Sequence, residues 1–173
     1  DGLLAEGADE TEHPALRDSY RGAGAKGAMS HDYNWADFIG DSKEPVDHFS
    51  HGTHVLGSVV GKGKDTPFGI APGAKWISAA ASDPGDGTEL PLVKAVQWMQ
   101  APTKVDGSDP DPTKAPDVVG MSWGSGRTDE RFWEDAIENL NAAGIEVVKS
   151  AGNHGAVTGP GHLDMVHTIA AVD

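Results

Sequence analysis

Apolar residues recur at helical spacing in three stretches of the chain. Those that follow His51 predict a helix over 53–60, and those in 90–100 predict a second helix. A third, amphipathic helix ended by Gly144 is indicated by five apolar residues that lie mostly three or four positions apart, namely Phe132, Trp133, Ala136, Ile137 and Leu140.

Short apolar runs between these stretches predict buried strands. We expect strands over 76–80, 117–122, 145–149 and 166–172. The last residues of a further strand are expected over 2–5. Residues 101–116 hold four prolines and several aspartates, which favours a long surface loop. Strands that alternate with helices predict an α/β fold, a three-layer sandwich with a mainly parallel central sheet. In such sheets functional sites lie at the carboxyl ends of the strands.

The composition narrows the class of protein. At 173 residues the chain is expected to form a single domain over 1–173, and it has no cysteine for a disulfide or a thiolate metal site. A net charge of −14 argues against nucleic acid or an anionic membrane as a partner. No segment approaches the roughly 18 apolar residues of a membrane span, and the chain opens at Asp1 without a signal peptide. We therefore expect an acidic, secreted, mature protein that is a monomer.

His51 stands where a predicted loop turns into the first helix. Gly52 and Thr53 follow it, and Val55 and Leu56 let the helix pack into a core while the histidine stays at its edge. A histidine held at the edge of a cleft can act as a general base near neutral pH. This stretch is therefore the first candidate for catalytic chemistry.

Four segments, in this order along the chain, resemble the motifs of the subtilisin-like serine peptidases. They are His51-Gly-Thr-His-Val, Gly69-Ile-Ala-Pro-Gly-Ala-Lys, Asp117-Val-Val-Gly-Met-Ser-Trp-Gly124 and Ser150-Ala-Gly-Asn153. The resemblance runs over nearly the whole chain and is closest to the bacillopeptidase F-like branch, through segments such as His13-Pro-Ala-Leu and Ala115-Pro-Asp-Val-Val. It implies a serine endopeptidase that hydrolyses peptide bonds by acyl transfer, with a polypeptide substrate or inhibitor as its partner.

The resemblance also implies a role for individual residues. His51 would be the general base toward a serine and then the acid toward the leaving amine. Asn153 would donate its side-chain N–H to the oxyanion. A substrate laid along the sheet edge would meet backbone groups of Ser122, Trp123 and Gly124. The pocket for the residue before the scissile bond would be bordered by Ala151 and Gly152.

Two positions depart from the family pattern. The catalytic aspartate of the family falls at Glu6 here, and Asp9 is the nearest aspartate and the alternative partner of His51. The family's serine lies in a Gly-Thr-Ser-Met-Ala element downstream of the strand that 166–173 resembles, and the sequence stops before it. We therefore expect the C-terminal part of the fold to be missing and this chain alone to be inactive.

Two other functions stay open. Without the serine, the chain is alternatively interpreted as a non-catalytic, peptidase-like fragment or binding module. Gly120-Met-Ser122-Trp-Gly124 also matches the Gly-x-Ser-x-Gly elbow of α/β-hydrolases, for which Asp164 and His167 would complete a triad. That hydrolase interpretation needs a helix directly after Ser122, and it leaves His51 and 150–153 unexplained.

No cofactor is required by the resemblance, and no metal site is expected from the spacing of side chains. His51 and His54 lack the i, i+4 spacing and the intervening glutamate of a zinc-binding helix. The aspartates in 106–111 lack the ordered Asp-x-Asp-x-Asp-Gly spacing of a calcium loop. A structural Ca²⁺ ion is still compatible with the family, whose calcium-binding loops vary.

Overall fold

Residues 13–82, 89–124 and 131–172 are described by the computed structural model, in which residue contacts divide the chain into two compact units. The first unit comprises Asp1–Pro91 and Thr103–Pro110, and the second comprises Leu92–Pro102 and Asp111–Asp173. Helices alternate with parallel strands along the chain, which confirms the predicted α/β class. The predicted end of a strand over 2–5 lies outside the described residues.

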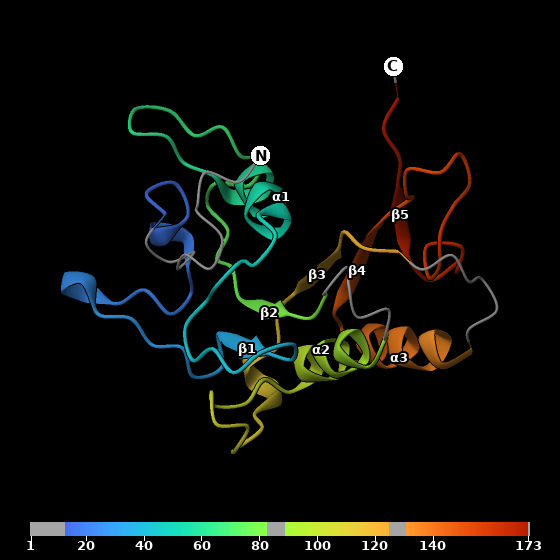
Figure 1. The fold of residues 1–173 in the computed structure, drawn as a ribbon, viewed down its shortest axis with the longest axis horizontal. Helices are drawn as coiled ribbons and strands as arrows, with labels where there is room; N and C mark the ends of the chain where they lie inside the picture. The colour runs from blue at the N-terminus through green and yellow to red at the C-terminus, as the bar shows by residue number, and fades with distance from the viewer. Residues whose placement is uncertain (1–12, 83–88, 125–130, 173) are drawn as a thin grey trace. The chain divides into compact units, whose positions relative to one another are not determined.

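The first unit contains a two-stranded parallel sheet and helix α1, His51–Val60 (Figure 1). Strand β1, Trp35–Asp37, pairs with β2, Ser78–Ala80. The apolar pattern predicted β2 within 76–80 but missed β1, because three residues are too few to show the alternation of a strand. Helix α1 begins two residues before the predicted start, since its first turn, His51 and Gly52, carries no apolar side chain.

The core of the first unit joins the segment before β1 to the segment that leads into β2. The rings of Tyr20 and Trp76 lie 4.5 Å apart at an angle of 46°. Trp76 Nε1 also donates a hydrogen bond of 2.9 Å to the carbonyl of Leu16. Two short 3-10 turns, η2 and η3, precede β1 and comprise Arg17–Ser19 and Ala25–Gly27.

The second unit contains a three-stranded parallel sheet in the order β3-β4-β5 (Figure 1). Its strands are β3, Val118–Met121, β4, Glu146–Ser150, and β5, His167–Ile169. Val119 lies opposite Val147. Each strand overlaps its predicted range, so the carboxyl ends of β3 and β4 fall where the substrate-binding motifs were predicted.

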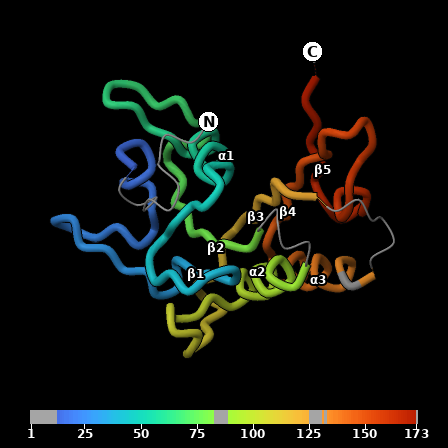
Figure 2. The backbone as a smooth tube through the Cα atoms, in the orientation of Figure 1, coloured from blue at the N-terminus to red at the C-terminus, as the bar shows by residue number. Residues whose placement is uncertain are grey.

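Helices α2, Leu90–Gln100, and α3, Arg131–Ala142, have the apolar faces that their spacing predicted. Along the chain α3 lies between β3 and β4, and it runs beside their sheet in Figure 2. This is the crossover connection that parallel neighbours require. The two helices and the sheet share one buried cluster, made of Val96, Val119, Met121, Trp133, Ile137, Leu140, Ile145, Val147 and Leu163.

Helix α3 ends at the predicted glycine. Gly144 has φ of 82°, and its N–H donates to the carbonyl of Asn141 at 2.9 Å. The N–H of Ile145 donates to the carbonyl of Leu140 at 3.0 Å. This pair of bonds is the Schellman arrangement, which satisfies the last carbonyls of the helix and turns the chain toward β4.

The predicted surface loop over 101–116 contains one further 3-10 turn, η4, Pro112–Lys114. The carboxylate of Asp111 caps this turn by accepting hydrogen bonds from the N–H and the hydroxyl of Thr113. None of the helices in the described residues combines the length and the apolar character that crossing a membrane requires.

Candidate active site

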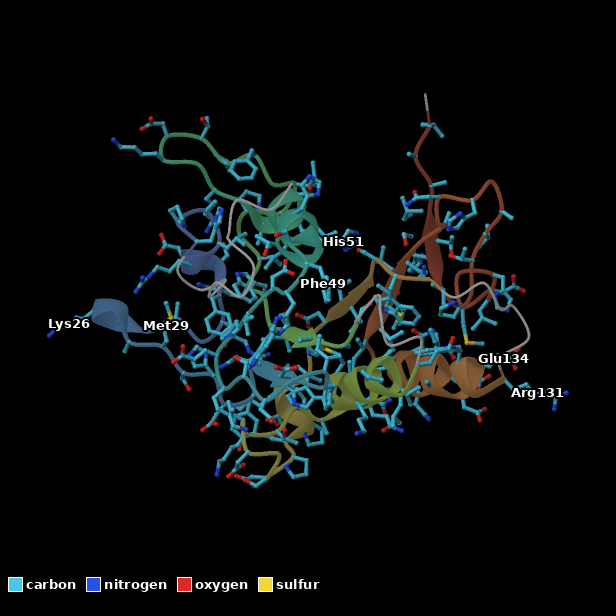
Figure 3. All side chains as sticks on the ribbon, in the orientation of Figure 1. Lys26, Met29, Phe49, His51, Arg131 and Glu134 are labelled. Atoms are coloured by element: carbon cyan, nitrogen blue, oxygen red, sulfur yellow. The ribbon has the colours of Figure 1, made fainter. Side chains whose placement is uncertain are left out.

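His51 is the first residue of α1, and its side chain is exposed to solvent. Figure 3 shows it at the start of the helix, next to Phe49. The preceding residue, Ser50, adopts the left-handed conformation with φ of 60°. The chain therefore turns sharply just before the helix and leaves the imidazole at its edge, as the sequence predicted.

The start of α1 is anchored by Asp47, a residue that the sequence analysis did not select. Its Oδ2 accepts hydrogen bonds from the N–H of Thr53 at 2.8 Å and from the Thr53 hydroxyl at 2.7 Å, and its Oδ1 accepts one from the N–H of Phe49 at 2.9 Å. The N-cap position itself is Ser50, whose side chain makes no capping hydrogen bond, so the usual capping signal does not identify Asp47 in the sequence.

The hydrogen bonds also set the charge of this carboxyl group. Burial of Asp47 favours the neutral acid, but the hydrogen bonds from Thr53 and from the N–H groups of Phe49 and Ser50 outweigh burial and hold its pKa below the usual value. Asp47 is therefore a buried anion at neutral pH, next to the first turn of the helix that carries His51.

Glu6 and Asp9, the two candidate carboxylate partners of His51, lie outside the described residues. The element that follows them is described. His13 is buried and its Nδ1 accepts a hydrogen bond of 3.2 Å from the N–H of Ala15, so this histidine has a structural role.

In the second unit, Ser122, Trp123 and Gly124 directly follow β3, at the carboxyl end that the sequence predicted. Ser122 and Gly124 are exposed, whereas Trp123 is half-buried. Its ring lies 4.8 Å from that of Trp133 in α3, at an angle of 43°. The packing of Trp123 against α3 thereby fixes the backbone on either side of it.

Ala151, Gly152 and Asn153 follow β4 in the same way. The N–H of Ala151 donates to the carbonyl of Ile169 at 2.8 Å, which extends the pairing with β5 by one residue. Gly152 has φ of 96°, and a Cβ there would lie 2.8 Å from Thr158 Oγ1, so both the backbone and the space require glycine. Asn153 is exposed beyond this turn.

The two segments that were predicted to bind substrate both contact Thr158. A Cβ at Gly124 would collide with Thr158 Oγ1, the same atom that limits the space at Gly152. Gly124 and Gly152 therefore face one small region of the second unit. His51 belongs to the first unit.

Lys149, the fourth residue of β4, is completely buried, and the sequence analysis did not select it. Its Nζ donates to the carbonyl of Ser150 at 2.7 Å and to the Ser150 hydroxyl at 3.2 Å, and it lies 5.7 Å from the centre of a Trp123 ring. Burial lowers the pKa of this ammonium group. Val147 and Lys149 share the buried face of β4, as the alternation of a strand requires, but the sequence does not show the partners of the ammonium group.

The residues of the α/β-hydrolase interpretation have other surroundings. Residues 122–124 are not helical, whereas an elbow serine is followed at once by a helix. His167 Nε2 lies 2.9 Å from Glu146 Oε2, so a glutamate of β4 is the partner of this histidine. Among the described residues, Ser122 is thus not followed at once by a helix, and His167 pairs with Glu146.

No group of three or more histidine, aspartate and glutamate side chains within the described ranges is arranged to hold a metal ion. The aspartates of the loop over 106–111 accept hydrogen bonds from their own loop and, at Asp109, also from the hydroxyl of Tyr33. Asp106 Oδ1 accepts one of 2.9 Å from the N–H of Ser108, and Asp109 Oδ2 pairs with Lys104 Nζ at 2.9 Å.

Comparison with known proteins gives a consistent result. The model of the subtilase family matches residues 2–173. Bacillopeptidase F of Bacillus subtilis (strain 168) is 38% identical over 148 residues, which are 83% of this chain and 10% of that protein. Serine protease AprX of the same organism is 31% identical over 152 residues, which are 80% of this chain and 33% of that protein. The chain thus spans at most a third of the length of these two relatives.

Solved structures resemble the fold over nearly the whole chain. Sphericase superposes with a TM-score of 0.61 at 25% identity, covering 98% of this chain and 51% of its own. The prenylagaramide maturation protease PagA superposes with a TM-score of 0.63 at 19% identity, covering 97% of this chain and 52% of its own. These similarities agree with the resemblance that the four ordered motifs predicted.

Proposed function

Because this chain belongs to the subtilase family, we propose that residues 1–173 are part of a serine endopeptidase that hydrolyses polypeptides by acyl transfer. The observation that carries the proposal is the position of His51 as the first residue of α1, with the helix anchored by hydrogen bonds between Asp47 and Thr53. An imidazole at an exposed, fixed helix start can take a proton from a nucleophile and return it to a leaving group.

In this proposal each of the remaining residues has a separate role. Glu6, or Asp9 in its place, orients the imidazole of His51 and stabilises its charged form. Asn153 donates a hydrogen bond to the oxyanion, for which its exposure beyond the turn at Gly152 is suitable. A polypeptide substrate or inhibitor lies along the edge formed by 122–124 and is bordered by 151–152, as a strand added to a sheet.

The nucleophilic serine is supplied by sequence outside residues 1–173, so this chain alone is inactive. We propose that 1–173 forms one peptidase domain together with that missing part. The same proposal includes secretion, a monomeric state and a bound Ca²⁺ ion whose role is structural only. The absence of cysteine and the net charge of −14 are compatible with all three.

A fluorophosphonate probe, which reacts with activated serines, tests the proposal on the longer polypeptide that contains this chain. We expect labelling and peptide hydrolysis in the native protein, and loss of both in His51→Ala. The matched control is His54→Ala, which changes an exposed histidine three residues along the same helix and should leave labelling intact. Asn153→Ala should lower kcat by about 10²–10³. A folded protein that never reacts with the probe would contradict the proposal.

A non-catalytic peptidase-like module is the second candidate function, and it is supported by Glu6 at the family's aspartate position. A hydrolysis assay on the longer polypeptide that contains this chain separates the two, because the 173-residue chain alone is expected to be inactive under both. Turnover that His51→Ala abolishes would contradict the non-catalytic module, and turnover that Ser122→Ala abolishes would favour the hydrolase interpretation.

A further inference from the structure

The first turn of α1 is capped by a carboxylate from the preceding loop. Ser50 is the cap residue by position, but its side chain makes no capping hydrogen bond. Asp47 supplies the acceptor instead, because its Oδ2 accepts hydrogen bonds from both the N–H and the hydroxyl of Thr53. The first N–H groups of a helix have no partner within the helix, so this carboxylate satisfies a donor that would otherwise be unpaired.

The same carboxylate also binds the chain on the other side of His51. Its Oδ1 accepts a hydrogen bond of 2.9 Å from the N–H of Phe49, which lies next to His51 in Figure 3. Asp47 therefore holds one residue two positions before His51 and, at Thr53, one residue two positions after it. Hydrogen bonds to an ionised acceptor are stronger than those between neutral groups, so this connection across His51 is firm.

The backbone directly before His51 needs such a connection. Ser50 has φ of 60°, and the left-handed conformation costs free energy for a residue other than glycine. A residue keeps this conformation only where the surrounding structure enforces it. The hydrogen bonds of Asp47 enforce it here, from both sides. If they were weakened, Ser50 would relax toward an ordinary conformation and the imidazole of His51 would project in another direction.

The side chains that make this anchor are separated from solvent. Asp47 and Thr53 are buried, whereas His51 is exposed. An effect of the buried pair on the reaction is therefore transmitted through the position of His51. Proton transfer is sensitive to that position, since a displacement of about 1 Å can cost about 10²-fold in rate.

We propose that Asp47, through its hydrogen bonds to Thr53 and Phe49, is a positioning residue that holds the imidazole of His51 where it accepts the proton of the serine. The inference rests on the proposed function and adds to it a residue on which the rate of the chemical step depends. Asp47 exchanges no proton and contacts no substrate. Its loss should therefore lower kcat and leave KM nearly unchanged.

The test uses Asp47→Asn in the longer polypeptide that carries the serine. Asparagine has nearly the same shape but only one acceptor oxygen, so it cannot keep the bonds to Thr53 and Phe49 together. We expect kcat for a fluorogenic peptide to fall by at least about tenfold, with KM changed by less than about twofold. The rate constant of fluorophosphonate labelling should fall by the same factor, because His51 must also activate the serine in that reaction.

Two substitutions of Thr53 test the bond itself. Thr53→Val keeps the branched shape and removes the hydroxyl, so it should lower kcat without changing KM. Thr53→Ser keeps the hydroxyl and should retain the kcat of the unchanged protein. In the double variant with Asp47→Asn, Thr53→Val should cause little further loss, since both changes remove the same contact. This pair also tests the inference if Asp47→Asn does not fold.

A matched control separates positioning from a general loss of stability. The carboxylate of Asp37, in the same unit, likewise accepts hydrogen bonds from three backbone N–H groups, those of Ile39, Gly40 and Ser42. None of these partners belongs to α1, so Asp37→Asn should leave kcat and the labelling rate unchanged. Circular dichroism at the assay temperature checks that every variant is folded.

The possible results separate this inference from the proposed function. An unchanged kcat in folded Asp47→Asn, an effect confined to KM, or an equal fall of kcat in Asp37→Asn overturns the role of Asp47 and leaves the peptidase assignment intact. If Asp47→Asn does not fold, an unchanged kcat in Thr53→Val has the same meaning. Absence of both hydrolysis and fluorophosphonate labelling in the unchanged protein overturns the peptidase assignment and this inference with it.

Discussion

At the scale of single residues, the first turn of α1 depends on one buried carboxylate. Asp47 accepts hydrogen bonds from Thr53 and from the N–H of Phe49, and these bonds connect the loop before the helix to its third residue. His51 lies between the two bonded positions. Its backbone is therefore fixed from both sides, although its side chain stays exposed.

We predict that Asp47→Asn lowers the free energy of unfolding by about 1–2 kcal/mol, because an amide keeps only one acceptor for these donors. Urea unfolding at pH 7 measures the loss, and Asp41→Asn, a change at an exposed position of the same loop, is the control.

The stabilisation by Asp47 should also depend on pH, because the folded state holds the pKa of this carboxyl group low. The stabilisation is complete above the ordinary aspartate pKa of about 3.9 and is lost as the pH falls through the pKa of the folded state. If the difference in the free energy of unfolding between the unchanged protein and Asp47→Asn stays constant down to about pH 2, this account is refuted.

At the scale of elements, Gly144 shows how one residue ends a helix. It has φ of 82°, and a Cβ there would meet open space. We predict that Gly144→Ala costs about 1 kcal/mol of stability, all of it from backbone strain, because nothing would clash with the new methyl group. The control is Gly120→Ala in β3, where the space is equally open and φ is not positive. Thermal unfolding of both variants distinguishes them, and equal midpoints would disprove the role of the conformation at Gly144.

The helices were predicted well because their signals are local and repeated. The bounds of α2 match the predicted range, and the glycine after α3 was correctly interpreted as its end. Strand β1 was missed because its three residues, Trp35–Asp37, pair with β2 through backbone groups that have no signature in the sequence.

For the candidate site, the location of several residues at strand ends was predicted from local motifs. Motifs placed Ser122–Gly124 and Ala151–Asn153 at strand ends, and the structure has them there. Asp47 and Lys149 were missed, because their importance comes from burial and from partners that only the fold brings close. A loop aspartate and a strand lysine are ordinary residues until those partners are known.

At the scale of the whole molecule, the charge is strongly unbalanced, with 27 acidic and 13 basic residues. Two contacts in the described part of the chain, the Lys104–Asp109 ion pair and the His167–Glu146 hydrogen bond, are exposed, so salt would remove little attraction from them. Repulsion among the remaining carboxylates opposes the compact state, and added salt screens it.

We therefore predict that the midpoint of thermal unfolding at pH 7 rises when NaCl is increased from about 0.01 M to about 0.5 M, since the screening length falls from roughly 30 Å to below 10 Å. Differential scanning calorimetry measures the shift, and KCl at equal ionic strength checks that it does not depend on the cation. A midpoint that falls with salt would mean that attractive pairs dominate.

The burial of Lys149 also gives the sheet of the second unit a chemical reporter. Amine-acylating reagents need an exposed amino group, and surface lysines such as Lys26 and Lys94 present one in the folded chain. Lys149 presents one only when β4 separates from its neighbours, because its side chain is completely enclosed. Acylation at this single residue therefore records how often the sheet opens, without any change to the sequence and without knowledge of the substrate.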